Sequence, residues 1–304
     1  MTRKRIETKE RQGIATRSQT NATIDGTRER KLSGDRVSPT IADIPIMLLL
    51  FFLSQGVSAA LLSLCGITLP DLTMTDAGNI EEFMRVQVIR GERIAVLYSV
   101  SMLVSLISVY LYVCLRGGRW RVARFSASGF NPNIILTGIV WVFAAQIVLE
   151  PIMSLLPSVD NAGVGRGLWA CITAMVFAPV FEETLCRGIV LETLRRRWGN
   201  AVAVIVSAMF FGIVHIEPAT ALAGVVVGMI FGMIYLRTGS LFSTIILHSI
   251  NNAAALALIC LDMDNVTLRD IIDNDAVYYA VYTVSCLLFF LFFLETSRKV
   301  FRKR

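Results

Sequence analysis

The stretch LWACITAMVFAPVFEETLCRG, residues 168–188, places two adjacent carboxylates and an arginine at the end of an apolar, membrane-grade segment. Ionisable side chains at membrane depth cost about 3 kcal/mol each on insertion scales, so they usually face a protein interior and serve a function. Glu183 and Arg187 are four residues apart, so on a helix they share a face and can pair. Glu182 points about 100° away around the helix. The stretch therefore predicts a buried ion pair beside a second carboxylate that is left for another partner.

The whole chain has the composition of a membrane protein. Its 304 residues are 55% hydrophobic and 17% charged, with a mean hydropathy of +0.63, whereas soluble domains average about 25% charged residues. We predict an all-α polytopic membrane protein with about eight transmembrane helices and a buried polar active site. The predicted apolar segments are residues 44–66, 94–115, 134–156, 168–187, 201–216, 219–236, 241–261 and 277–296.

The charged residues predict how the chain is oriented. The excess of basic residues, 29 Lys and Arg against 23 Asp and Glu, does not indicate a nucleic-acid partner, because these residues gather in the tail and in short loops. Basic clusters follow the second, fourth and eighth apolar segments, and the alternate loops are acidic or mixed. This alternation predicts a multi-pass plasma-membrane protein with both termini in the cytoplasm and with membrane lipid as a partner.

Three regions follow from these patterns. Residues 1–43 are polar and rich in both charge signs, which predicts a disordered basic cytoplasmic tail. Residues 44–297 form the predicted transmembrane helical domain, and residues 298–304 a basic cytoplasmic C-terminus. The six cysteines lie in or beside apolar runs without CxxC spacing, so we interpret them as small buried hydrophobic residues.

Both histidines of the chain lie in apolar context. His215 stands in FFGIVHIEP and His248 in IILHSINN. A structural alternative is that each histidine only joins helices by hydrogen bonding, but a chain that uses histidine nowhere else favours a functional role. His248 and Asn252 are four residues apart and present an imidazole and an amide in one direction. Phe211 and His215 have the same spacing, although an apolar Phe is most often a packing residue.

These residue types indicate hydrolysis of an amide by one of two routes. A buried carboxylate beside an imidazole can hold and deprotonate a water molecule. A second histidine with an asparagine amide can donate hydrogen bonds to the developing oxyanion. Alternatively, Glu182, His215 and His248 bind zinc and leave one position open for water. The residues leave this choice open, and they indicate no other cofactor.

The three motifs EETLCR, FGIVH and HSINN occur in order on successive apolar segments. In this order they resemble the CPBP family of intramembrane endopeptidases, which includes the type II CAAX prenyl endopeptidases. The resemblance covers about residues 165–260 and implies an all-helical, eight-span core. It implies that Glu182 and His215 activate the water and that His248 and Asn252 stabilise the oxyanion. Glu183, Arg187 and Phe211 would support these groups.

The leading interpretation is therefore an intramembrane endopeptidase that acts on a membrane-associated or lipidated peptide or protein. A proton-coupled transporter is the first alternative, since intramembrane Glu and His also form proton relays. The compact cluster of polar residues and the lack of an evident inverted repeat argue against it. A non-catalytic immunity or scaffold protein on the same fold is the second alternative.

One feature of the spacing predicts a turn. His215 lies fifteen residues after Asn200, about 22 Å along a helix, which is too deep to meet Glu182 and His248 in the cytoplasmic half. We therefore expect the segment HIEPATALAG, residues 215–224, to turn back as a shallow hairpin. Such a turn is tolerated at membrane depth only where protein buries it.

Overall fold

The structure is a computed structural model that describes residues 39–70, 80–116, 130–156, 165–261, 263 and 266–301. Residues 1–38 of the predicted tail and residues 302–304 of the predicted C-terminal segment lie outside these ranges. Within them every regular element is a helix. The elements are α2 (Asp43–Leu64), α3 (Ile80–Leu115), α4 (Pro132–Met153), α5 (Leu168–Ile172), η4 (Thr173–Phe177), α6 (Ala178–Glu183), η5 (Thr184–Leu191), α7 (Glu192–Ile213), α8 (Pro218–Thr238), α9 (Leu241–Cys260), α10 (Leu268–Ile271) and α11 (Asp275–Phe301).

In the described part of the chain, seven helices are long and apolar enough to cross a membrane. One of them, Leu168–Ile213, is 46 residues long and unites the fourth and fifth predicted segments. Gly199 interrupts it with φ 78° and ψ 176°, a conformation that glycine adopts at little steric cost. All eight predicted segments are thus helical, although two of them form the arms of one broken helix. The chain is an all-α polytopic membrane protein.

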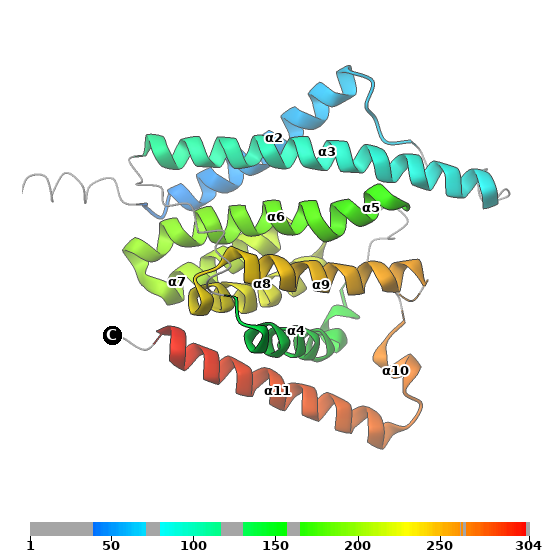
Figure 1. Cartoon of the computed structure of the whole chain (residues 1–304), viewed down its shortest axis with the longest axis vertical. Helices are drawn as coiled ribbons and strands as arrows, with labels where there is room; N and C mark the ends of the chain where they lie inside the picture. Colours follow the sequence, from blue (N-terminus) through cyan, green and yellow to red (C-terminus); the bar gives the residue numbers. More distant parts are fainter. Residues whose placement is uncertain are drawn as a thin grey trace, which may run out of the picture.

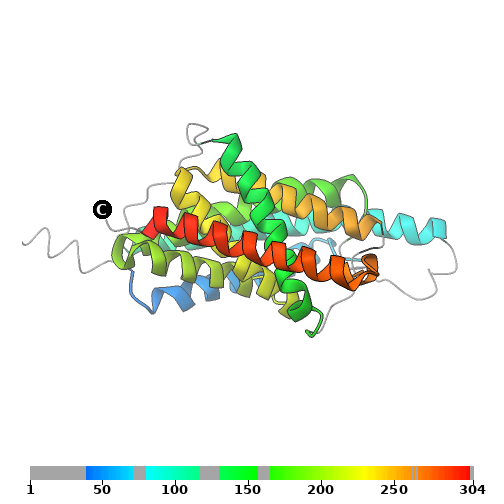
Figure 2. The ribbon, with the colours of Figure 1, turned by 90° about the horizontal axis from the view of Figure 1, so that it is seen from below.

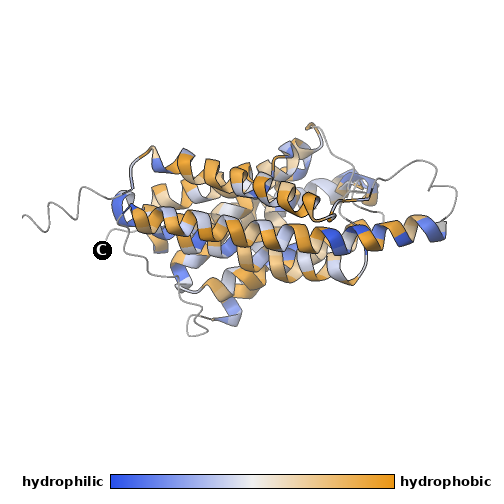
Figure 3. Cartoon of the chain, turned by 90° about the horizontal axis from the view of Figure 1, so that it is seen from above, coloured by the Kyte–Doolittle hydropathy of each residue, from blue (hydrophilic) through white to orange (hydrophobic). Residues whose placement is uncertain are grey.

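The third element is longer than its apolar segment predicts. α3 has 36 residues, about 54 Å at 1.5 Å per residue, whereas a bilayer core is about 30 Å thick. Its extra turns precede residue 94 and are rich in Glu and Arg. Figure 3 shows this hydrophilic end projecting from the apolar bundle. The sequence-based limit at residue 94 therefore marks the end of the apolar stretch and not the end of the helix.

The long helices form one bundle, with α2 and α3 on one side and α11 on the other (Figure 1). Seen from below, α11 crosses α4 (Figure 2). The C-terminal ends of α3 and α11 and the start of α7 lie at the left of Figure 1. Contacts join some of them there: Asn200 Nδ2 donates to the Val300 carbonyl at 3.0 Å, and Arg237 lies 3.8 Å from Glu295. These described helix ends thus lie at one end of the bundle, and the orientation of that end in a membrane stays a prediction.

The outer surface of the bundle is apolar. Many large hydrophobic side chains are more than half exposed on it, including Leu61, Leu136 and Leu291, as a lipid-facing surface requires. The prediction of six buried cysteines is wrong for five of them, because only Cys186 is buried. In a membrane protein an apolar residue can face lipid as well as the core, so an apolar context does not by itself predict burial.

The tight hairpin that carries His215 consists of two parts: the arm of α7 that follows Gly199, and the helix α8. This arm, residues 200–213, is about 21 Å long, and residues 214–217 form the turn, in which Ile216 has φ 61°. Small residues allow the two helices to approach: a Cβ on Gly228 would lie 3.1 Å from the Ala208 Cα, and a Cβ on Gly224 would lie 3.3 Å from the Gly212 Cα. The hairpin expected from the sequence is present, and its depth in a bilayer stays a prediction.

We predict that Gly212→Ala destabilises this hairpin. The added Cβ would lie 2.4 Å from the Val225 Cγ2 and 2.6 Å from the Ala221 carbonyl oxygen, and overpacking of this kind costs about 1–3 kcal/mol. That loss exceeds the gain of about 1 kcal/mol in helix propensity. Thermal unfolding of the purified protein in detergent should show a lower midpoint. Gly56→Ala is the matched control, since no atom lies within 4 Å of its added Cβ; equal midpoints for the two variants would contradict the prediction.

Candidate active site

The two adjacent carboxylates lie at the end of α6, between two π-helical turns. η4 precedes α6 and η5 follows it, and π-helical insertions widen a helix and leave some carbonyl groups for other donors. Side chains from neighbouring helices take two of these carbonyls. Asn252 Nδ2 on α9 donates to the Ala174 carbonyl at 3.0 Å, and Ser207 Oγ on α7 donates to the Cys186 carbonyl at 2.8 Å. The irregular turns thus tie the carboxylate-bearing helix to α7 and α9.

Glu183 and Arg187 form the ion pair that their spacing predicts. Arg187 Nη1 donates to Glu183 Oε1 at 2.8 Å, and both side chains are 0% exposed. Arg187 Nη2 donates to the Gly228 carbonyl on α8 at 2.8 Å. The guanidinium also lies over the rings of Phe211, at 4.8 Å, and Phe231, at 5.5 Å. A fully buried charge is stable only when paired and hydrogen-bonded, and these contacts from three helices supply that.

Glu182 points away from this pair and meets both histidines. Its Oε2 lies 4.0 Å from Nε2 of His215 and 3.7 Å from Nε2 of His248. Oε2 is buried and accepts no hydrogen bond within the described ranges. Its Oε1 accepts a hydrogen bond of 2.6 Å from the Tyr98 hydroxyl on α3. The two oxygens of one carboxylate therefore have different neighbours.

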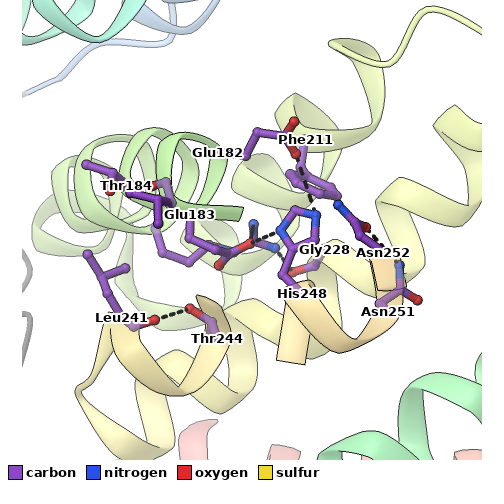
Figure 4. Close-up of polar contacts among 12 residues, drawn as sticks. Glu182, Glu183, Thr184, Phe211, Gly228, Leu241, Thr244, His248, Asn251 and Asn252 are labelled. Atoms are coloured by element: carbon purple, nitrogen blue, oxygen red, sulfur yellow. Dashed lines mark hydrogen bonds and ion pairs between the residues drawn. The ribbon is translucent and has the colours of Figure 1, made fainter. Parts of the chain in front are cut away.

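The second nitrogen of each imidazole is already engaged. His215 Nδ1 lies 2.7 Å from the Phe211 carbonyl, and because a carbonyl only accepts, Nδ1 must carry the proton. His248 Nδ1 lies 3.2 Å from Glu183 Oε1, a carboxylate oxygen that Arg187 also contacts, so Nδ1 is again the donor. In the neutral form of either ring, the lone pair is therefore on the Nε2 that faces Glu182. Figure 4 shows Glu183 and His248 directed toward one another, with Glu182 and Phe211 beside them.

Phe211 is more central than a packing residue needs to be. Its ring centroid lies 4.9 Å from that of His215 and 5.5 Å from that of His248, and its carbonyl holds His215 Nδ1. The ring thus lies beside the Arg187 guanidinium and both imidazoles. It limits the positions that the two histidines can adopt.

Asn252 lies one turn beyond His248 on α9, and it takes part in a chain of amides. Its Nδ2 donates to the Ala174 carbonyl, and its Oδ1 accepts from Asn251 Nδ2 at 3.3 Å. Asn251 Oδ1 accepts in turn from Gln146 Nε2 on α4 at 3.3 Å. One of the two N–H groups of Asn252 is thus committed to a backbone carbonyl, and no contact of the described residues joins the Asn252 side chain to Glu182 or to either histidine.

The sequence reasoning identified the three carboxylate and imidazole groups that meet, but it missed Tyr98 and Gln146. Both are polar residues in the middle of predicted apolar segments. The rule that singled out the histidines, a polar side chain at membrane depth, could have found them. It was not decisive, because an uncharged Tyr or Gln in a span often only joins helices.

The donors at this site suit zinc in kind but not in spacing. Ligands at about 2.0 Å from a tetrahedral ion are about 3.3 Å apart, whereas Oε2 of Glu182 is 3.7 and 4.0 Å from the two Nε2 atoms. Within the described ranges, no three His, Cys, Asp or Glu side chains form a group that could hold a metal ion as they stand. A zinc site would need the carboxylate and the imidazoles to approach one another.

We predict that Arg187→Met strongly destabilises the fold, because it leaves the Glu183 carboxylate buried without its cation. Removing one partner of a buried pair costs about 3–5 kcal/mol. The double variant Glu183→Gln/Arg187→Met should be less destabilised than Arg187→Met alone, since neither charge then remains. The measurement is thermal unfolding in detergent.

A matched control is Lys299→Met, which removes another pair with i, i+4 spacing, to Glu295, in which both side chains are 51% exposed. Exposed pairs contribute little to stability, so its midpoint should stay close to that of the unmodified chain. If Arg187→Met unfolds at the same temperature as Lys299→Met, the buried pair does not have the structural role described above.

Comparison with known proteins bears on the same part of the chain. Residues 164–254, which are 91 of the 304 residues, match the model of the family described as Type II CAAX prenyl endopeptidase Rce1-like. No curated protein and no solved structure matches the chain. The matched segment contains Glu182, Glu183, His215, His248 and Asn252. Through this segment, the chain is similar to the type II CAAX prenyl endopeptidases.

Proposed function

We propose that this chain is an intramembrane endopeptidase that cleaves a peptide bond of a membrane-associated or lipidated substrate. One observation carries the proposal: Glu182 Oε2 faces the Nε2 atoms of both histidines, at 4.0 Å and 3.7 Å, while the Nδ1 atom of each ring is held elsewhere. The family whose model matches residues 164–254 supports the same reaction class.

Glu182 and His215 are the proposed water-activating pair. Their facing atoms are 4.0 Å apart, too far for a direct hydrogen bond and close enough for one water molecule to bond to both. A water between them would donate to the Glu182 carboxylate and to the His215 lone pair, which leaves its oxygen lone pairs for the carbonyl carbon of the substrate. Transfer of its proton to this pair as the new C–O bond forms is general-base catalysis. Return of that proton from the pair to the amide nitrogen then lets the C–N bond break and the amine leave.

His248 and Asn252 are the proposed oxyanion donors. His248 Nδ1 is bound to Glu183, so donation from Nε2 as well requires an imidazolium. With His248 charged, the four groups Glu182, Glu183, Arg187 and His248 have no net charge, which suits a site of low polarity. The N–H of Asn252 that is not bound to Ala174 is the second donor. Preorganised donors of this kind commonly contribute about 3–4 kcal/mol to the stability of the transition state.

Glu183 and Arg187 support this arrangement without taking part in it. Glu183 holds His248 from behind at 3.2 Å, and Arg187 keeps Glu183 in place at 2.8 Å. The Phe211 ring separates the guanidinium from the imidazole of His215. The fully buried Glu183–Arg187 pair, which solvent does not reach, therefore holds in place the polar groups that would contact the substrate.

A metal-dependent reaction is the second candidate. The observation that favours it is that two neutral imidazoles direct lone pairs at one carboxylate oxygen, as in zinc sites with two His ligands and one Glu. Glu182, His215 and His248 would be the ligands, and zinc would supply Lewis-acid activation of the water. Their spacing favours the metal-independent route.

The family points to a CAAX-type substrate, a protein with a lipidated C-terminal segment. A lipid anchor would bring such a peptide to the membrane surface that the enzyme shares. We propose that the chain acts in the plasma membrane with both termini in the cytoplasm, since its basic helix ends gather at one end of the bundle. Under this orientation the end of the bundle at the left of Figure 1 is the cytoplasmic one.

We predict that Glu182→Ala, His215→Ala and His248→Ala each abolish cleavage while the protein still accumulates in the membrane. Each variant removes a group that would contact the water or the oxyanion. Asn252→Ala should lower kcat about 10²- to 10³-fold, as removal of one oxyanion donor does. The measurement is cleavage of a farnesylated CAAX peptide by purified protein in detergent, with membrane levels followed by immunoblot.

A second test requires no choice of substrate. Protein termini are compared between membranes of cells that carry the unmodified chain and membranes of cells that carry Glu182→Ala. At least one precursor should accumulate in the variant. Glu217→Ala is a control, because the half-buried Glu217 side chain bonds to Thr220 at the start of α8, and none of its bonds in the described part of the chain goes to Glu182, His248 or Asn252. Full activity of any of the three alanine variants at Glu182, His215 or His248 would refute the assignment.

We expect the activity to survive prolonged treatment with a chelator such as 1,10-phenanthroline, because the proposed route uses only Glu182 and His215 as the base. Metal content of the purified protein, measured by inductively coupled plasma mass spectrometry, should not follow activity. Loss of activity on chelation that is restored by zinc would instead establish the second candidate.

A further inference from the structure

Tyr98 contacts the proposed catalytic carboxylate from outside the family-matched segment. Its hydroxyl donates to Glu182 Oε1 at 2.6 Å, the length of a strong, charge-assisted O–H···O bond. It belongs to α3, 84 positions before Glu182 in the chain, whereas the family match begins at residue 164. No motif of the chain includes it.

This hydrogen bond decides which oxygen of Glu182 faces the histidines. The terminal torsion of a glutamate side chain is broad, so a free carboxylate can present either oxygen or an intermediate orientation. With Oε1 bound to Tyr98, Oε2 is the oxygen that lies 3.7 Å from His248 and 4.0 Å from His215. The bond thereby sets the separation into which one water molecule fits.

The backbone at Tyr98 is itself held in place. Its carbonyl accepts from Ser101 Oγ at 3.1 Å, and farther along α3 Ser105 and Ser108 bond to Gln55 and Ser54 of α2, both at 3.1 Å. On the other side, α3 approaches the start of the carboxylate-bearing helix so closely that a Cβ on Gly91 would lie 2.4 Å from the Arg166 carbonyl oxygen. α3 is therefore fixed both to α2 and to the element that carries Glu182.

We propose that Tyr98 is a positioning residue for hydrolysis, which orients the Glu182 carboxylate so that Oε2 is the general base. This inference rests on the proposed function. It adds α3 to the site, so the active site is completed by a helix that the family match does not cover. Tyr98 acts through Glu182 and contributes no group to the bond that is broken.

The test is Tyr98→Phe in the purified full-length protein, assayed with the farnesylated CAAX peptide. Loss of an orienting partner should lower kcat about 10- to 100-fold and leave KM within about twofold, because in the proposed role the phenol acts on Glu182 and not on the substrate. Tyr110→Phe makes the same chemical change at an exposed position of α3 and should retain full kcat.

A second measurement separates orientation from simple packing. Fluorinated tyrosines placed at position 98 keep the shape of the ring and change the acidity of the hydroxyl, so kcat should change with their acidity if the bond to Glu182 matters. A packing role predicts the same kcat for all of them and for tyrosine. Thermal midpoints measured in parallel show whether each variant is folded.

The outcomes are distinguishable from a failure of the proposed function. If Glu182→Ala is inactive and Tyr98→Phe has unchanged kcat, the positioning role is overturned and the endopeptidase proposal stands. If Glu182→Ala is as active as the unmodified chain, both are overturned. If the unmodified protein does not cleave the peptide, the same variants are compared by the membrane termini that depend on Glu182, where Tyr98→Phe should accumulate the same precursors as Glu182→Ala.

Discussion

The guanidinium of Arg187 lies with no exposed surface between a carboxylate, a backbone carbonyl and the faces of two aromatic rings. A charge can be buried in this way only if its partners are in place. Those partners come from its own helix, from α7 and from α8, and through Glu183 the same group reaches His248 on α9. A displacement of α7 or α8 would take away the ring or carbonyl contacts of this buried guanidinium, so the ion restricts how the site-bearing helices can be arranged.

Two neighbouring carboxylates on α6 serve different ends because consecutive residues of a helix point about 100° apart. Glu183 is directed inward, where it is fully buried and paired. Glu182 is directed toward α3 and the α7–α8 turn, and its side chain keeps 14% exposure. His248 contacts both, through Nδ1 on one side and Nε2 on the other. The His248 imidazole therefore lies between the buried, paired Glu183 and the proposed catalytic Glu182. Through this contact the rigid core holds the group that would act on the substrate.

Irregular backbone has a consistent place in this fold. The two π-helical segments flank the carboxylates, Gly199 breaks the long helix, and Ile216 takes a positive φ next to His215. Regular helices satisfy their own backbone groups, which a membrane demands, whereas these deviations leave groups that side chains of adjacent helices satisfy. Ser207 and Asn252 do so at the two π segments. The two π-helical segments thus occur where protein surrounds the chain and where the candidate site is assembled, whereas Gly199 and Ile216 are exposed.

The amino-acid sequence by itself determined the helical, membrane-spanning class. An apolar run of spanning length can satisfy all of its own backbone hydrogen bonds within a membrane only as a helix. It also determined the Glu183–Arg187 pair, since spacing along one helix fixes which side chains share a face. Only the tertiary structure decided what lies between helices. It extended α3 beyond its apolar stretch, joined two spans through Gly199, set five cysteines outside the core and brought Tyr98 to Glu182. Such contacts depend on helix crossing and on side-chain rotation across gaps of dozens of residues, and no local pattern in the chain records them.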